Sequence, residues 1–353
     1  MTNAVGPGDL LDRLRDALAA AHSPLAGAPL EPMPDKGLAH HHVRLAGTGV
    51  IARLPKQSQM GLDTRDNLAY QAACYRRAGV TGAVPALIGL LAPDRTLPRG
   101  GLLVQEIVGR PARLPGDLQA IAAALAAIHA LPLPAPAQRP PLRDDADPLR
   151  ALRHEIESQA VHLDGAGLTP AWRARVDAQR DALRRQCDAR ARPRRRLVAF
   201  DAHPGNFVVR GDGSAVLVDL EKARYSYPPL DLAHATLYTS TTWDLDAHAE
   251  LTLDEVEATY AHWADRVDIG MTSRRWFVPL RAAMWLWSLT WCAKWRALSP
   301  REASGTAAAE DWSHRHSDAA LVAHVRERVD CYLSAPAIER VVEELAALQR
   351  RFA

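Results

Sequence analysis

The sequence has little of what marks a disulfide-rich, metal-binding or nucleic-acid-binding protein. Only four of its 353 residues are cysteine, and no two are spaced as Cys-x-x-Cys, so it predicts neither a zinc knuckle nor a redox pair. Its 43 basic residues are balanced by 41 acidic ones. Because proteins dedicated to nucleic acid are usually far more basic, we expect no nucleic-acid partner.

The sequence also lacks a clear export or membrane signal. The amino terminus has no basic start followed by an apolar run, which argues against a signal peptide. The most apolar stretch, residues 276–295, contains Arg281 and Lys294 and is therefore a poor membrane span. We expect a buried helix there, in a cytoplasmic protein with no membrane partner. Attachment to a membrane through this helix is a rival interpretation.

What the sequence does have is the composition of an ordinary globular protein, with 48% hydrophobic and 24% charged residues. At about 150 residues per domain, its length predicts roughly two lobes. The first hundred residues alternate between strand-like and helical patterns. The expected elements are a leading helix at 9–21, strands at 41–45 and 50–54 joined by a glycine turn, a helix at 65–78, and strands at 84–92 and 101–108.

From about residue 112 the pattern becomes mainly helical. Asp117 stands where it could cap a helix whose apolar residues recur at helical spacing. Helices at 147–160 and 170–190 follow, and then a hairpin in which FVVR and AVLVDL flank the turn GDGS. Residues 230–353 show the pattern of one helix after another.

The residues with the clearest chemistry lie in and around that hairpin. Asp201 and Asn206 stand five residues apart in the loop before it, and Asp219 ends its second strand. Two carboxylates and an amide oxygen placed in this way can converge on one point, and hard oxygen ligands suit Mg²⁺. A catalytic Asp, then an Asn, then a metal-binding Asp is the order found in kinases, where phosphoryl transfer depends mainly on positioning and on neutralised charge.

At these residues the chain resembles the aminoglycoside phosphotransferase and choline kinase family, which has the protein-kinase-like fold. Members carry a stretch close to H-G-D-x-H-P-G-N, a strand that ends in D-x-E, and a D-L-A. This chain has AFDAHPGN at 199–206, DLE at 219–221 and DLA at 231–233. Segments similar to the family's covering loop, phosphate-binding strand, hinge and following helix are KGLAHHHVRL at 36–45, VIARLP at 50–55, LLVQEIVGRP at 102–111 and LAAIHALP at 125–132.

The resemblance implies an α+β, bilobal protein-kinase-like fold, with a small mixed β-sheet lobe and a larger, mainly helical lobe. Four segments are expected. They are an N-terminal helix at 1–25, a nucleotide-covering N-lobe at 26–103, a hinge at 104–111, and a helical C-lobe at 112–353 that contains the catalytic loop and hairpin at 197–221.

The function implied is transfer of the γ-phosphoryl group of ATP, with Mg²⁺, to a hydroxyl of a small molecule. Asp201 would orient or deprotonate that hydroxyl, and Asn206 and Asp219 would hold Mg²⁺. The residues implied to bind the nucleotide are Gly37 of the covering loop, Arg53, and Gln105, Glu106 and Ile107 of the hinge. His203 and Glu221 also fall inside the motif, and Asp231 is implied to tie down the catalytic loop from within the large lobe.

Three departures from the family pattern bear on this assignment. Ala199 and Phe200 stand where the family usually has His and Gly, which questions the geometry of the loop more than its chemistry. The helix after the Arg53 strand has no glutamate to pair with that arginine, and Gln71 is its nearest polar candidate. Gly37 is the only flexible residue in the covering loop. These departures motivate a rival hypothesis, a catalytically inactive kinase-like module that binds a nucleotide or a protein.

The phosphate acceptor stays open among an aminoglycoside-like polyamine, an amino alcohol such as choline or ethanolamine, and a sugar or macrolide hydroxyl. Residues 244–257 carry six acids and no Lys or Arg, which could attract a cation or simply begin a helix. Most of the seven tryptophans between 243 and 295 are expected in the core, although one or two could stack on a cation.

Two further patterns have ordinary structural interpretations. The seven arginines of 184–196 are interpreted as a solvated helix end and linker rather than as a site for an acidic partner. The triplet His40–His42 predicts no metal site, because neighbouring residues of a strand point to opposite faces.

Overall fold

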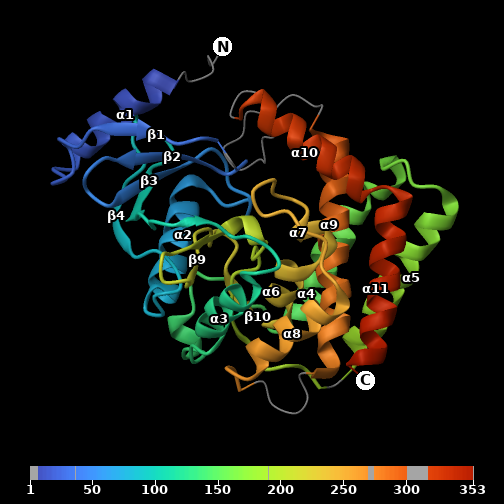
Figure 1. Cartoon of the computed structure of the whole chain (residues 1–353). Helices are drawn as coiled ribbons and strands as arrows, with labels where there is room; N and C mark the ends of the chain where they lie inside the picture. The colour runs from blue at the N-terminus through green and yellow to red at the C-terminus, as the bar shows by residue number, and fades with distance from the viewer. Residues whose placement is uncertain (1–6, 36, 190, 269–273, 300–316, 353) are drawn as a thin grey trace. The chain divides into compact units, whose positions relative to one another are not determined.

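A computed structural model of the chain describes residues 7–35, 37–189, 191–268, 274–299 and 317–352. The chain divides into two compact units. Unit 1 comprises Met1–Ile107 and Ser299–Arg326, and unit 2 comprises Val108–Leu298 and Glu327–Ala353. Figure 1 labels the elements of both units.

Unit 1 contains a five-stranded antiparallel sheet with the strand order β1-β2-β3-β5-β4 (Figure 1). The predicted hairpin of β2 and β3 is confirmed, with Val43 opposite Ala52. Its turn contains Gly47 and Gly49 at φ values of 75° and 68°, a conformation that glycine adopts without steric cost. The elements are α1 (Pro7–Ala20), β1 (Leu30–Pro32), β2 (His40–Leu45), β3 (Val50–Pro55), α2 (Thr64–Gly79), β4 (Leu87–Leu91) and β5 (Gly101–Gln105).

Both predicted helices of unit 1 form. The apolar side of α1 packs on the sheet, where Leu14 and Leu18 share a buried cluster with Val43 and Leu54. Helix α2 begins after Asp63, whose carboxylate accepts a hydrogen bond from the Asp66 N–H at 2.9 Å and so satisfies one of the free donors of the first turn.

The strands predicted at 84–92 and 101–108 are shorter than expected. Strand β4 starts at Leu87, after Pro85, which has no N–H to give to a ladder. Strand β5 ends at Gln105, because its partner β3 begins at Val50 and Val50–Gln105 is the last pair of the register.

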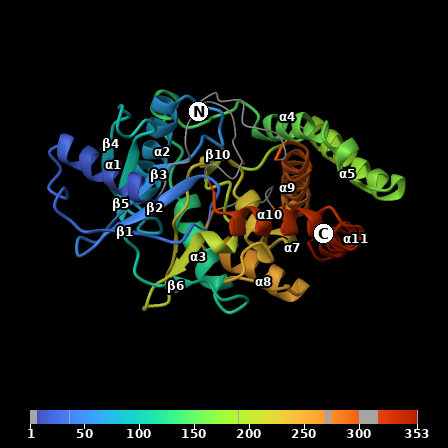
Figure 2. The same cartoon turned by 90° about the horizontal axis from the view of Figure 1, so that it is seen from above.

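Unit 2 is mainly helical, and most residues of its long helix α9 (Phe277–Leu298) are buried. It contacts α4, α5, α6 and α11, and Figure 2 shows it nearly end-on. Because α9 is mainly apolar around its circumference, burial among other helices is its expected environment, and the prediction of a buried helix is confirmed. Across the described segments, every helix is too short or too polar to cross a membrane.

Two small sheets supplement the helices of unit 2, one of β10 with β7 and one of β6-β8-β9. The predicted hairpin is confirmed as β8 and β9, which pair Phe207 with Leu217. The remaining elements of the chain are β6 (Arg110–Pro111), α3 (Leu118–His129), α4 (Pro148–Ala160), α5 (Pro170–Asp188), β7 (Arg196–Val198), β8 (Phe207–Val209), β9 (Ala215–Leu217), β10 (Arg224–Ser226), α6 (Pro229–Thr236), α7 (Tyr238–Thr241), α8 (Leu253–Ala264), α10 (Ala319–Tyr332) and α11 (Ala335–Arg351). Of these, α10 belongs to unit 1 up to Arg326 and to unit 2 from Glu327. Part of the predicted helical run, residues 269–273 and 300–316, lies outside the described residues.

The predicted helix cap at Asp117 is wrong. Helix α3 starts there, but the Asp117 side chain makes no capping hydrogen bond. Its carboxylate instead accepts two hydrogen bonds from Arg110, at 2.6 and 3.0 Å, and one from the Arg113 N–H at 2.6 Å. A bidentate guanidinium is a stronger partner for a carboxylate than a neutral helix amide, and the arginine therefore replaces the cap.

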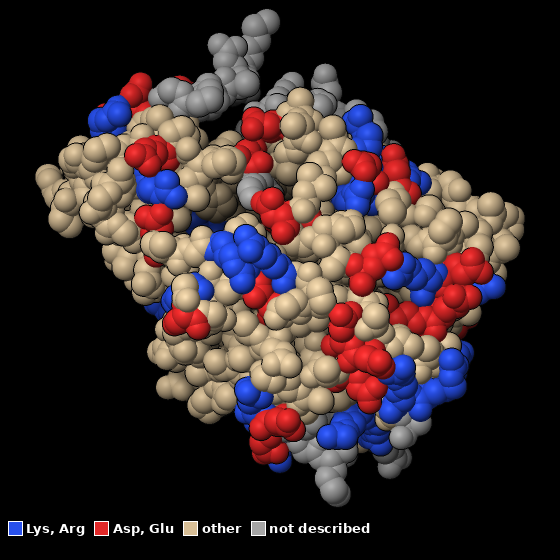
Figure 3. Space-filling model, in the orientation of Figure 1, with Lys and Arg blue, Asp and Glu red and all other residues tan. Residues whose placement is uncertain are grey.

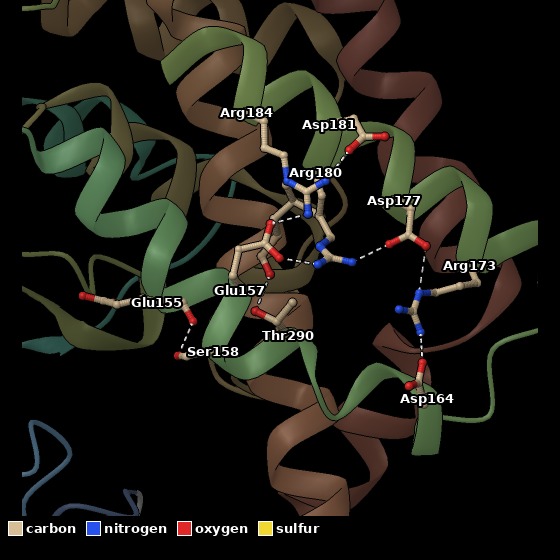
Figure 4. A network of polar contacts seen from close by, with 11 residues as sticks. Glu155, Glu157, Ser158, Asp164, Arg173, Asp177, Arg180, Asp181, Arg184 and Thr290 are labelled. Atoms are coloured by element: carbon tan, nitrogen blue, oxygen red, sulfur yellow. Dashed lines mark hydrogen bonds and ion pairs between the residues drawn. The ribbon is translucent and has the colours of Figure 1, made fainter. Parts of the chain in front are cut away.

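The arginine-rich stretch at 184–196 is paired with acids of its own unit. Arg184 binds Asp181 at 2.7 Å, and further pairs join Arg192 to Asp147, Arg194 to Asp268 and Arg195 to Asp144. Figure 4 shows the adjoining network, in which Arg180 lies between Glu157 and Asp177. Acidic and basic side chains are also interspersed over the face drawn in Figure 3. These ion pairs agree with the interpretation of the stretch as a helix end and linker.

Candidate active site

The loop that carries Asp201 is fixed by a buried carboxylate. It follows β7, and Asp231 at the start of α6 accepts hydrogen bonds from the backbone N–H groups of Ala199, at 2.7 Å, and Phe200, at 2.8 Å. The side chain of Asp231 is fully buried. The prediction that Asp231 ties down this loop is therefore confirmed.

Asp231 is held in turn by a buried histidine. The indole N–H of Trp263 donates to His129 Nδ1 at 2.9 Å. Because an indole nitrogen can only donate, Nδ1 is unprotonated, and Nε2 carries the proton that it donates to Asp231 Oδ2 at 3.0 Å. The chain of three side chains therefore fixes the histidine tautomer and the position of the loop.

Phe200 adopts a backbone conformation that usually favours glycine. Its φ is +63°, a left-handed value that costs a residue with a Cβ about 1–2 kcal/mol. The ring is buried against the edge of Trp287, with centroids 5.2 Å apart, and the Arg224 guanidinium carbon lies 3.7 Å from the ring centroid. The loop thus keeps a glycine-like turn although the family glycine is missing, and ring packing offsets its cost.

Asp201 forms an ion pair that the sequence did not reveal. Its Oδ2 lies 2.6 Å from Lys222 Nζ, and both side chains are largely buried, with exposed fractions of 15% and 12%. Burial alone would raise the pKa of the Asp201 carboxyl, but Lys222, His203 and His234 hold that pKa below its ordinary value. The carboxylate is therefore ionised at neutral pH.

Asn206 and Asp219 are brought together by the hairpin. Asn206 immediately precedes β8, and Asp219 stands two residues after β9. The backbone carbonyl of Asn206 accepts from the Val218 N–H at 2.9 Å, and its side-chain Nδ2 donates to the Asp201 carbonyl at 2.8 Å. With the amide nitrogen turned to the loop, Oδ1 is the end that can serve a cation. Together with the Asp219 carboxylate it makes an oxygen donor set that fits Mg²⁺.

In unit 1, the predicted nucleotide residue Arg53 lies on β3 and is buried. Its Nη2 donates to His40 Nδ1 at 3.4 Å, and His40 Nε2 lies 2.9 Å from Gln71 Oε1. Since an arginine can only donate, Nδ1 is the accepting nitrogen in this contact, and the Nε2–H of His40 donates to Gln71. Two side chains, His40 and Gln71, therefore support Arg53 on this side. Sequence reasoning identified Gln71 but not His40.

The covering loop of unit 1 is held by residues that sequence reasoning missed. Lys56 Nζ is fully buried, pairs with Asp35 at 2.6 Å and donates to the Gly37 carbonyl at 2.9 Å. Gln57 Nε2 donates to the Leu38 carbonyl at 3.0 Å. The loop around Gly37 is therefore anchored through its backbone. The sequence offered one indication of this role, because Lys56 is a charged residue that directly follows a mainly apolar strand.

The three hinge residues differ in what their backbones can offer. The N–H of Gln105 donates to Ala86 and that of Glu106 to Gly49, at 2.8 and 2.7 Å. For Ile107, the hydrogen bonds recorded among the described residues include none from its N–H. A base at this position would therefore find its donor at Ile107 rather than at Gln105 or Glu106.

Comparison with known proteins agrees with this architecture. The model of the phosphotransferase enzyme family matches residues 42–277, and the chain belongs to that family. No curated protein matches it by sequence.

Solved structures show the same fold. A choline/ethanolamine kinase family protein from Mesorhizobium loti is 19% identical, with a TM-score of 0.58 over 97% of this chain and 99% of that one. A macrolide 2′-phosphotransferase from Brachybacterium faecium is 15% identical, with a TM-score of 0.56 over 92% and 99%. An aminoglycoside phosphotransferase from Alicyclobacillus acidocaldarius is 15% identical, with a TM-score of 0.52 over 92% and 93%. The predicted α+β, protein-kinase-like fold is confirmed.

Proposed function

We propose that the protein transfers the γ-phosphoryl group of ATP to a hydroxyl of a small molecule, with Mg²⁺ bound beside the phosphates. The acceptor oxygen bonds to the γ-phosphorus while the bond from that phosphorus to the β–γ bridging oxygen breaks, and ADP leaves. The hydroxyl proton passes to Asp201. The observation that carries this proposal is the Asp201 carboxylate, which is buried, ionised and fixed on a loop that the Asn206 side chain contacts.

In this proposal Asn206 and Asp219 hold Mg²⁺, which would neutralise charge on the phosphate oxygens. Glu221 follows Asp219 in the same turn, and its N–H donates to Asp219 Oδ1 at 3.3 Å, which helps to orient that ligand. His203 lies next to His234, with ring centroids 5.9 Å apart. We assign His203 to shaping the loop around Asp201.

The nucleotide side of the proposal rests on unit 1. Arg53 would contact the phosphates, with His40 and Gln71 holding its guanidinium. The covering loop around Gly37 would close over the phosphates in a shape that Lys56 and Gln57 set. The backbone of Gln105, Glu106 and Ile107 would receive the adenine, through the Ile107 N–H.

We infer that the acceptor carries an amino group, because an acid of unit 2 lies directly against the catalytic loop. A Cβ added to Gly205 would come within 2.6 Å of Asp244 Oδ2. The acidic segment therefore has two parts. Asp254 and Glu255 sit in the first turn of α8, where Glu255 completes a capping box with Thr252. Asp244 is the acid placed to attract a cation near Asp201.

Several hydroxyl groups of α7 favour an acceptor that also bears hydroxyls, such as an aminoglycoside-like molecule. The side-chain oxygens of Thr239, Ser240 and Thr241 are buried, and none has a hydrogen-bond partner among the described residues. Helix α7 contacts the turn at Pro204–Asn206. Buried polar groups without partners usually have a reason, and a polyhydroxylated ligand would supply partners.

A simpler amino alcohol is the second candidate, favoured by an aromatic cluster. Trp243, next to Asp244, lies 5.9 Å from Trp291 and 6.1 Å from Tyr332 between ring centroids. Aromatic faces bind ammonium groups. A panel of aminoglycosides, amino alcohols, sugars and macrolides, with ADP release as the readout, separates the candidates.

Calorimetric titration of a non-hydrolysable ATP analogue tests the site before any acceptor is known. We expect binding that depends on Mg²⁺ in the wild type, loss of that dependence in Asp219→Ala, and nearly unchanged binding in Asp201→Asn. Unchanged binding in Asp219→Ala would remove the metal role. If the protein binds the nucleotide but turns over no acceptor of the panel, the rival hypothesis of a catalytically inactive kinase-like module would be favoured instead.

A further inference from the structure

Lys222 has no part in the roles assigned so far, yet it makes the shortest contact to the proposed base. It stands three residues after Asp219, in a turn closed by the hydrogen bond from the Ala223 N–H to the Leu220 carbonyl at 3.0 Å. That turn carries its side chain to Asp201, where Nζ donates to Oδ2 at 2.6 Å. The charges facing Lys222 are Asp201, Glu221 and Asp219.

The ammonium of Lys222 also contacts an aromatic ring, that of Trp287, which is itself held by a hydrogen bond. Nζ lies 5.5 Å from the centroid of the Trp287 ring, within the range of a cation–π contact. The Trp287 N–H donates to Glu155 Oε2 at 3.1 Å, and Arg224 donates to Oε1 of the same carboxylate at 2.9 Å. Lys222 is therefore fixed by its turn, by Asp201 and by a ring that is itself hydrogen-bonded.

The ion pair leaves the two oxygens of Asp201 in different environments. Oδ2 is bound by Lys222. Oδ1 lies 3.7 Å from His234 Nδ1, which is beyond ordinary hydrogen-bond distance. Burial lowers the pKa of His234 to about 4, so the imidazole is neutral at pH 7, and Lys222 is the cation that binds a carboxylate oxygen of Asp201 directly. Rotation of the carboxylate about its χ2 bond would break the contact to Lys222.

We propose that Lys222 is the positioning residue of Asp201: its ammonium fixes Oδ2 so that Oδ1 faces the hydroxyl of the phosphate acceptor. The inference rests on the proposed function, since it assigns a role in that reaction. It accounts for a lysine in a chain that uses arginine nearly everywhere else. A compact ammonium binds one carboxylate oxygen, whereas a guanidinium fork tends to take both.

The test compares Lys222→Met with Lys222→Arg, and uses Lys294→Met on α9 as the matched control. With the best acceptor of the panel, we expect Lys222→Met to lower kcat about 100-fold, at the lower end of what general-base catalysis contributes. The KM of the acceptor and the affinity for the ATP analogue should stay within threefold of wild type. Lys222→Arg should recover only part of the loss, and Lys294→Met should resemble wild type.

A double-mutant cycle with Asp201→Asn separates positioning from a purely structural role. If Lys222 acts through Asp201, Lys222→Met should change the residual kcat of Asp201→Asn less than threefold. Equal losses in both backgrounds, or a wild-type kcat in Lys222→Met, would overturn the inference. If Lys222→Met does not fold, Lys222→Gln replaces it in the double-mutant cycle, and thermal melting checks that each variant is folded. Absence of turnover in the wild type would sink the proposed function itself, a result distinct from any of these.

Discussion

In unit 2 the loop of Asp201 is fixed by charged groups, Lys222 and Asp231, whereas in unit 1 the guanidinium of Arg53 contacts His40, which is hydrogen-bonded to the uncharged side chain of Gln71. Removing one partner of a buried ion pair leaves an uncompensated charge, which costs more than the loss of a neutral hydrogen bond. From this difference we expect substitutions of Lys222 or Asp231 to have severe effects, and substitutions of Gln71 to have mild ones.

The largest effect on stability is expected where charge supports the catalytic loop. Asp231→Ala leaves two buried backbone N–H groups and the Nε2–H of His129 without their acceptor. At about 1–3 kcal/mol for each unsatisfied group, with partial relaxation, we expect the free energy of unfolding to fall by about 4 kcal/mol. Urea unfolding measures it, with the exposed Asp246→Ala as the control. A loss below 1 kcal/mol would show that the loop does not depend on Asp231.

A somewhat smaller effect should follow from the neutral member of the charged cluster, His234. Burial lowers the pKa of this group to about 4 from an ordinary 6.5, so between these values the unfolded chain binds a proton that the folded chain does not. The free energy of unfolding should therefore fall as the pH drops from 6.5 to 4, by about 3 kcal/mol in total. Above pH 6.5 this contribution is constant.

Urea unfolding at several pH values measures the slope, and the variant His234→Asn should flatten it. The exposed His248→Asn serves as the control, since it removes a histidine outside the cluster. Equal slopes for wild type and His234→Asn would mean that the acid sensitivity arises elsewhere, and the neutral character of His234 would lose its support.

The smallest effect is expected in unit 1. Gln71→Glu places a carboxylate beside His40 Nε2, which favours the protonated imidazole and puts a second cation next to Arg53. We expect the affinity for the ATP analogue to fall about fivefold, or about 1 kcal/mol, while Gln71→Met costs less. Calorimetry at pH 7 gives both values. Tighter binding by Gln71→Glu would show that residue 71 pairs with Arg53 directly, and the contrast between the units would disappear.

Much of the fold could be predicted from local pattern. The glycine turn between β2 and β3, the apolar spacing of α1 and α2, and the mainly apolar sequence of α9 each specify their element with short-range information. The predictions were wrong where a residue distant in the sequence determines the local structure. The Asp117 side chain binds Arg110 instead of the helix end, and β5 ends where its register with β3 reaches the glycine turn.

The candidate site divides in the same way. Asp201, Asn206 and Asp219 could be identified because they lie within one hairpin and its loop, and their roles stay proposals. Lys222 stands in that same segment, but only the fold shows that its turn reaches Asp201. In the sequence, His40 is one of three consecutive histidines. Its neighbours Arg53 and Gln71 come from other elements. Sequence spacing carried no information about that contact.

Because the chain contains few lysines, its buried lysines can serve as probes of local unfolding. Two of the four lysines, Lys56 in unit 1 and Lys222 in unit 2, are buried in ion pairs with exposed fractions of 0% and 12%. An amine-reactive label reaches each one only when its own surroundings loosen. Peptide mass spectrometry after brief labelling would thus report the local unfolding of each unit separately, at two reporters that the native chain already contains.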